Sequence, residues 1–159
     1  MKTADKKKSF CTIGVISDTH GLLRPEVVQA FHHVERIIHA GDIGNEKILL
    51  ELEHIAPVTA VRGNMDGDWA FHLKRTEALD ISGNLIYVIH DIDRLDLDPD
   101  SSGVSVVISG HSHKPSVSRR NGVLYMNPGS AGPRRFTLPI SAGLLHINIK
   151  GIKAELIRL

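Results

Sequence analysis

The chain has 159 residues with a formal net charge of +1, and 42% of the residues are hydrophobic. This composition excludes an intrinsically disordered chain and fits one domain with a single sizeable core. A charge so close to zero gives no strong nucleic-acid signal, and the apolar runs are too short to span a membrane. The only cysteine, Cys11, excludes an internal disulfide and favours a reducing, cytoplasmic location.

The N-terminus is predicted to be a flexible tail over residues 1–10. It contains three consecutive lysines at residues 6–8, which favour a solvated segment. The apolar stretch that follows is short and contains Thr12 and Gly14, so it is typical of a first strand rather than of an export signal. Residues 11–159 are then predicted to form a single domain.

The first half of this domain alternates between strands and helices. The pattern predicts strands over residues 12–17, 36–39 and 58–61, and helices over residues 25–34 and 45–54. Pro25 fits the first turn of its helix, where a missing N–H costs nothing. This order predicts parallel strands joined by right-handed crossovers.

The second half is rich in strands instead. Strands are expected over residues 78–81, 85–89, 104–109, 116–119, 123–126, 144–149 and 153–157. Short turns separate three pairs of them, the clearest being Asn121-Gly122, which favours a type I′ hairpin. Residues 91–102 are acidic and suggest an exposed loop with one helical turn. Two sheets packed face to face, with helices outside, accommodate both halves.

Metal-binding residue types follow five of the predicted strands. Ligands gather outside the carboxyl ends of parallel strands, so these side chains are expected to converge on one site. They comprise two carboxylates, one amide and four imidazoles, which suits borderline divalent metals. Their number is enough for two ions if one carboxylate bridges both. The residues are Asp18, His20, Asp42, Asn64, His90, His111 and His113.

These motifs resemble the calcineurin-like metallophosphoesterase superfamily, within it the small bacterial and archaeal single-domain phosphodiesterases. The order of motifs is Asp-x-His, Gly-Asp, Gly-Asn-x-Asp, His and Gly-His-x-His, and the similarity covers roughly residues 12–134. Residues 39–42, 61–64 and 127–130 carry the closest likeness. The resemblance implies an α/β fold, a four-layer α-β-β-α sandwich with two mixed β-sheets.

The resemblance also implies a role for each ligand. A first divalent metal ion would be held by Asp18, His20 and His113. A second would be held by Asn64, His90 and His111, and Asp42 would bridge the two ions. Manganese is the first candidate, with Zn, Fe, Ni, Co and Mg as alternatives. A metal-bridging hydroxide would attack a phosphate ester in line, beside the catalytic residues Asn64, His90, His111 and Asp66. Asn64 and Arg134 would contact the substrate.

Three departures from the family pattern bear on the chemistry. Met65 stands where larger members carry a histidine thought to protonate the leaving group, and a thioether cannot transfer a proton. Esters with good leaving groups are therefore favoured. Asp91 replaces a glycine, and would either repel an anionic substrate or support His90. Asn45 replaces a usual aspartate.

Several alternatives remain open at this level. The superfamily includes a catalytically inactive retromer subunit, so a scaffold for protein–protein contacts is the rival to a hydrolase, and a nuclease is disfavoured by the charge. Asn64 could instead supply a left-handed turn, and Trp69 and Phe71 could line a substrate wall or pack in the core. A homo-oligomer also remains open. His39 is expected to be a packed, hydrogen-bonded support, whereas the other histidines are expected to lie outside the site: His32, His33, His54, His72 and His146.

Overall fold

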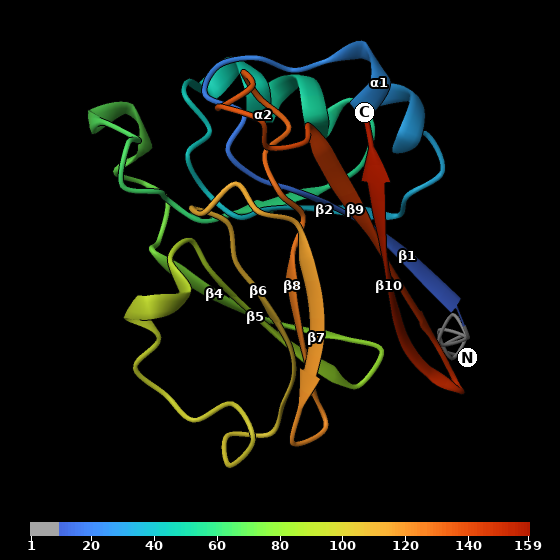
Figure 1. Cartoon of the computed structure of the whole chain (residues 1–159). Coiled ribbons are helices and arrows are strands. Elements are labelled where there is room, and N and C mark those ends of the chain that lie inside the picture. Colours follow the sequence, from blue (N-terminus) through green and yellow to red (C-terminus); the bar gives the residue numbers. More distant parts are fainter. Residues whose placement is uncertain (1–9) are drawn as a thin grey trace, which may run out of the picture.

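Two mixed five-stranded sheets are packed face to face in the computed structural model, which describes residues 10–159 (Figure 1). Sheet A has the strand order β10 (Gly151–Arg158), β9 (Ser141–Asn148), β1 (Phe10–Ile16), β2 (Arg36–His39) and β3 (Val58–Ala60). Sheet B has the order β4 (Thr76–Ile81), β5 (Asn84–Ile89), β6 (Val104–Ile108), β8 (Val123–Asn127) and β7 (Ser116–Arg120). The α/β fold with two mixed sheets is therefore confirmed.

The strands that lead to the predicted ligands run parallel. β1 pairs with β2 and β2 with β3 in sheet A, and β5 pairs with β6 in sheet B. The antiparallel neighbours β9, β10, β4 and β7 extend the sheets away from these strands. The Asn121-Gly122 turn joins β7 to β8 with φ of 51° and 78°, as a type I′ hairpin requires.

Two helices cover the outer face of sheet A. They are α1 (Pro25–Ala30) and α2 (Glu46–Glu53). α1 is four residues shorter than predicted, because the chain turns at Phe31. The Phe31 ring lies against Gly14, where any Cβ would meet ring carbons at 2.9 Å. Val34 then bonds back to Phe31, and Glu35 bonds to Thr12, which starts β2 beside β1.

Alternation along the strands divides the apolar residues between two layers. Ile13 and Val15 of β1 face sheet B in the core between the sheets, whereas Ile16 faces the helices. In β2, Ile38 faces sheet B and Ile37 faces the helices. The parallel strands are thus buried on both faces, which fixes their register and the positions of their carboxyl ends.

The outer face of sheet B is covered by the loop after β5 (Figure 1). This segment has one turn of 3₁₀ helix, η2 (Ile92–Arg94), as the sequence predicted. Its acidic residues are mostly exposed, but Ile92, Leu95 and Leu97 pack against the sheet. The fourth layer of the sandwich is therefore a loop with a single 3₁₀ turn, whereas the first layer consists of the two α-helices.

The remaining elements lie outside these layers. A short 3₁₀ helix, η1 (Asp68–Ala70), lies between β3 and β4. Residues 1–9 of the predicted tail lie outside the described part of the chain, and Phe10 already belongs to β1. Neither α-helix within residues 10–159 has the length and apolarity needed to cross a membrane.

Candidate metal centre

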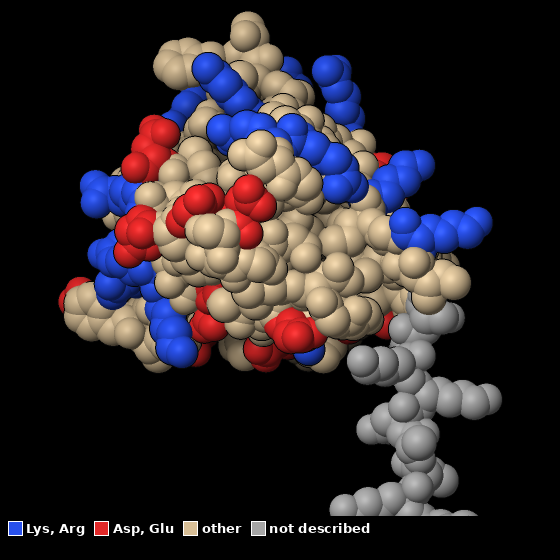
Figure 2. Space-filling view, turned by 90° about the horizontal axis from the view of Figure 1, so that it is seen from below, with Lys and Arg blue, Asp and Glu red and all other residues tan. Residues whose placement is uncertain are grey.

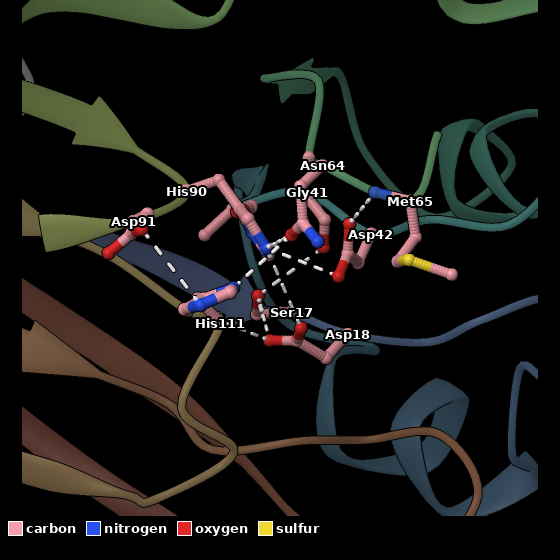
Figure 3. Close-up of polar contacts among 12 residues, drawn as sticks. Ser17, Asp18, Gly41, Asp42, Asn64, Met65, His90, Asp91 and His111 are labelled. Carbon is pink, nitrogen blue, oxygen red and sulfur yellow. Dashed lines mark hydrogen bonds and ion pairs between the residues drawn. The ribbon is translucent and has the colours of Figure 1, made fainter. Parts of the chain in front are cut away.

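The carboxyl ends of β1, β2, β3, β5 and β6 bring the predicted ligands together. Figure 3 shows five of them turned toward a common point, namely Asp18, Asp42, Asn64, His90 and His111. Six of the seven form two groups, in each of which one ligand atom per residue lies within 4.8 Å of the others. The first group is Asp18, His20 and His113, and the second is Asp42, His90 and His111.

Asp18 is the buried carboxylate of the first group. Its Oδ2 accepts hydrogen bonds from the Ser17 hydroxyl at 2.6 Å and from the His111 backbone N–H at 3.1 Å. Its Oδ1 is buried without a hydrogen-bond partner among the described residues, and lies 3.3 Å from Nε2 of His113. Burial opposes ionisation, but the contacts with His113 and Ser17 outweigh it and lower the pKa of Asp18.

The two imidazoles of the first group approach each other through the same ring atom. Nε2 of His20 lies 3.4 Å from Nε2 of His113, and the ring centroids are 5.4 Å apart. At most one hydrogen bond can join two such nitrogens, whereas a metal ion takes a lone pair from each. The arrangement is therefore suited to a cation.

Asp42 faces both groups. Its Oδ1 accepts the backbone N–H of Met65 at 2.9 Å, which fixes the carboxylate. Its Oδ2 lies 3.2 Å from Nε2 of His90 in the second group and 3.9 Å from Nε2 of His20 in the first. Burial acts to raise the pKa of Asp42, but His90 and the Met65 N–H outweigh it, so the pKa is lowered and the oxygen stays anionic.

His90 is held in one orientation by its backbone contact. Its Nδ1–H donates to the Ala40 carbonyl at 2.7 Å, so that Nε2 points into the site. There Nε2 lies 3.0 Å from Oδ1 of Asn64, and the same oxygen lies 3.2 Å from Nδ1 of His111. Burial disfavours a charged His90, but Asp42 and Asp18 outweigh it and raise its pKa. Asn64 thus completes the second group.

Five of the predicted ligands have left-handed backbone, which is uncommon in residues other than glycine. Such residues persist only where the surrounding structure imposes the conformation, and they cluster at functional sites. Asn64 does not share it, so the alternative that Asn64 serves as a left-handed turn is wrong. The five are Asp18 (φ 56°), His20 (φ 46°), Asp42 (φ 54°), His111 (φ 70°) and His113 (φ 61°).

Asp66, a predicted catalytic residue, uses both of its carboxylate oxygens to accept backbone N–H groups. Its Oδ1 accepts the backbone N–H groups of Ile43 at 2.9 Å and Gly44 at 3.0 Å. Its Oδ2 accepts the N–H of Gly63 at 3.0 Å. The carboxylate therefore ties the loop that carries Asp42 to the loop that carries Asn64, and acts as a positioning residue.

His39 is the buried support that the sequence predicted. The Gly41 N–H donates to its Nδ1 at 3.2 Å, so its Nε2–H donates to Oγ1 of Thr19 at 3.0 Å. The Thr19 hydroxyl in turn donates to the Ile43 carbonyl at 2.8 Å. Burial lowers the pKa of His39 to about 3. A neutral imidazole thus joins the loop after β1 to the loop after β2.

This neutral His39 is expected to make the protein less stable in acid. In the unfolded chain the His39 imidazole takes up a proton below its ordinary pKa of 6.5, whereas in the folded chain it does so only near pH 3. The free energy of unfolding should therefore fall by up to about 1.4 kcal/mol per pH unit below pH 6.5. Urea unfolding between pH 6.5 and 4.5 should show this slope in the wild type and lose it in His39→Asn.

The matched control is His72→Asn. His72 is exposed and, within residues 10–159, its side chain bonds only to the carbonyl of Trp69, so its replacement should leave the slope unchanged. Equal slopes in the wild type and in His39→Asn would contradict the assignment.

A cavity of about 600 Å³ opens beside the second group. Among its lining residues are Asn64, His90 and His111, together with Arg62, Arg75 and Arg94. The sequence analysis missed these three arginines; only Arg62 had a signal, since it directly precedes Gly63-Asn64. Arg134, the predicted substrate contact, is exposed and does not line this cavity.

The residues that depart from the family pattern lie on opposite sides of the centre. Met65 lies beside Asp42, and Asp91 lies beyond His111 (Figure 3). Oδ2 of Asp91 is 3.9 Å from Nε2 of His111 and 3.7 Å from Nε of Arg94. Its Oδ1 accepts the N–H of Asp93 and starts η2. Asp91 therefore faces His111, and not His90 as one sequence hypothesis held.

The turn that begins at Asn127 supports the centre. Asn127 donates its Nδ2–H to the Gly110 carbonyl at 3.0 Å and so braces the loop before His111.

Trp69 packs partly buried in the layer beneath the helices, whereas Phe71 is exposed with Arg62 stacked over its ring at 5.1 Å. Trp69 thus packs against the core, as one alternative held, whereas Phe71 is exposed and is not among the residues that line the cavity, so neither alternative applies to it.

The residues present fit a pair of divalent ions. The donors are carboxylate, amide and imidazole groups, which suit borderline divalent metals. Two buried aspartates are held ionised, and Oδ1 of Asp18 has no hydrogen-bond partner among the described residues. Buried anions of this kind need a positive charge close by.

Comparisons with known proteins agree with this geometry. The chain matches the calcineurin-like phosphoesterase superfamily domain over residues 12–150. It is 39% identical over 158 residues to a probable metallophosphoesterase of Methanothermobacter thermautotrophicus, covering 92% of this chain and 91% of the relative. An archaeal phosphodiesterase of known structure is 26% identical in sequence to this chain, with a TM-score of 0.79. The match covers 93% of this chain and 99% of the phosphodiesterase.

A vacuolar protein sorting protein shares the same fold. Vacuolar protein sorting 29 of Cryptosporidium parvum has a TM-score of 0.76 to this chain. The match covers 94% of this chain and 98% of the sorting protein. The two are only 16% identical, so this likeness concerns the fold alone.

Proposed function

This chain belongs to the calcineurin-like phosphoesterase superfamily, and from that premise we propose that it is a two-metal phosphodiesterase acting on a small phosphate ester. The observation that carries the proposal is the position of Asp42 between the two ligand groups, 3.2 Å from His90 and 3.9 Å from His20. The likeness to an archaeal phosphodiesterase supports a diester substrate.

The side chains of the centre would bind the metal ions and orient the substrate. One cation would be held by Asp18, His20 and His113. The other would be held by Asn64, His90 and His111. Asp42 would contact both cations. When bound, two divalent ions lower the pKa of a water molecule and polarise phosphoryl oxygens. Asn64 directs its Oδ1 toward two imidazoles, which leaves its Nδ2–H groups to donate to a phosphate oxygen. Manganese is our first candidate for both positions.

The leaving group must depart without help from residue 65. Met65 donates its backbone N–H to Asp42, and its side chain is 69% exposed and cannot carry a proton. We therefore expect esters whose leaving groups have a low pKa to be cleaved fastest. A nitrophenyl ester meets this requirement, which makes it a suitable probe.

The surface argues for a small substrate rather than a nucleic acid. On the face in Figure 2, Lys and Arg side chains are interspersed with Asp and Glu side chains. Nucleic-acid-binding domains concentrate basic residues on one face, and the net charge here is only +1. We place the enzyme in the cytoplasm, on the basis of its single buried cysteine.

Removing and restoring metal tests the proposal against the scaffold alternative. We expect chelation with EDTA to abolish hydrolysis of bis(p-nitrophenyl) phosphate and added Mn²⁺ to restore it, with about two metal ions bound per chain by elemental analysis. If Mn²⁺, Zn²⁺, Co²⁺, Ni²⁺, Fe²⁺ and Mg²⁺ all give no turnover, the chain is a scaffold and not a hydrolase.

A further inference from the structure

The cavity beside the second ligand group has an excess of positive charge. Arg62, Arg75 and Arg94 line it, together with Asp91 and Asp96. Arg94 lies 3.7 Å from Asp91, so these two largely offset each other. Arg62 and Arg75 make no ion pair with any acidic side chain of residues 10–159, and only Asp96 then opposes them. These five side chains together carry one net positive charge, which favours an anion in the cavity.

Arg62 is held ready for a ligand. Its backbone N–H donates to the Lys74 carbonyl at 2.8 Å, and its guanidinium lies over the Phe71 ring at 5.1 Å. Its Nε is buried and has no hydrogen-bond partner within the described chain. A buried charged donor without a partner is costly, so this guanidinium has hydrogen-bonding capacity that the described residues do not use.

The size and position of the cavity connect this charge to the metal centre. Its volume of about 600 Å³ greatly exceeds that of a single phosphate and falls within the range of roughly 300–1,000 Å³ that holds ligands of nucleotide size. Asn64, His90 and His111 form part of the same wall. One molecule can therefore place one phosphate at the metal ligands and another group against the arginines.

We propose that Arg62 and Arg75 form a subsite for a second phosphate group, so that the preferred substrates are phosphodiesters that carry an additional terminal phosphate. This proposal rests on the phosphodiesterase function proposed above. A dianionic phosphate matches the charge of two guanidinium groups, each of which can bond two oxygens at once. The subsite binds the part of the substrate that does not react, and so sets specificity without taking part in the bond cleavage.

Two chromogenic esters with the same scissile bond test the subsite. Thymidine 5′-(p-nitrophenyl phosphate) and its 3′-phosphorylated derivative release the same leaving group and differ by one phosphate. We expect kcat/KM to be about tenfold or more higher for the phosphorylated ester, the gain expected of charge-assisted hydrogen bonds at a partly exposed site. This preference should shrink as ionic strength rises.

Charge variants should move this preference in opposite directions. Arg62→Gln and Arg75→Gln should each lower the ratio of the two kcat/KM values about five- to tenfold, whereas Asp96→Asn should raise it. Arg158→Gln is the matched control, since Arg158 is exposed on β10, at the edge of sheet A opposite β3. Should Arg62→Gln fold poorly, Arg75→Gln provides the same test at an exposed position.

The outcomes separate this subsite from the phosphodiesterase function itself. If neither ester nor bis(p-nitrophenyl) phosphate is cleaved with any metal, the proposed function fails. If all are cleaved but the wild type shows no preference, or the arginine variants keep it, the second-phosphate subsite is disproved and the phosphodiesterase stands.

Discussion

Replacement of Asp42 by asparagine is expected to lower kcat/KM for bis(p-nitrophenyl) phosphate by about a thousandfold or more. Oδ2 of Asp42 faces both ligand groups, at 3.2 Å from Nε2 of His90 and 3.9 Å from Nε2 of His20. Asparagine keeps the shape and the hydrogen bond from Met65 but removes the negative charge. Loss of charge stabilisation at a two-metal site costs several kcal/mol, and each 1.4 kcal/mol is tenfold in rate.

Metal content should fall together with the rate. Elemental analysis of Asp42→Asn after dialysis should find less metal per chain than in the wild type. Asp80→Asn is the matched control, because Asp80 lies in β4 near the hairpin that joins β4 to β5, at the end of β5 opposite His90. Wild-type turnover by Asp42→Asn would mean that the cations, if bound, do not share this carboxylate.

The sequence predicted which residues gather at the centre because they follow a pattern with a simple physical basis. Each buried parallel strand is an apolar run, and its end is marked by the first polar residues after it. Asp18, Asp42 and His90 occupy such ends, and parallel pairing brings the ends together. The fold followed from the same signals, since period and turn chemistry distinguish the helical first half from the hairpins of the second.

The surroundings of the ligands could not be predicted in this way. Arg75 and Arg94 reach the cavity from segments without periodicity, so their direction depends on the course of each loop. The same reason explains why Asp91 faces His111 and why Arg134 lies outside the cavity. Asp66 had a recognised position in the motif, but its bonds to Ile43 and Gly44 cross between two loops that the sequence does not place relative to each other.

Replacement of Gly63 by alanine is expected to disturb Asp42 directly, although Gly63 itself bears no functional group. A Cβ built on Gly63 would overlap the Oδ1 and the backbone nitrogen of Asp42, and would lie 2.8 Å from its carboxylate carbon. Both obstacles belong to a loop that Asp66 ties down, so they cannot move aside freely. Gly63→Ala should therefore displace Asp42, lower kcat/KM about a hundredfold or more, and reduce the free energy of unfolding by about 1–3 kcal/mol.

Gly67→Ala separates this steric effect from the general effect of replacing glycine in the same loop. Gly67 has φ of −87°, and a Cβ there would meet nothing within 4 Å. Its replacement should leave both the rate and the urea midpoint close to the wild-type values. The decisive comparison is metal affinity, which Gly63→Ala should weaken because the carboxylate shifts, while Gly67→Ala should not. If Gly63→Ala bound metal and turned over substrate normally, the loop would have adapted, and the position of Asp42 would not depend on this contact.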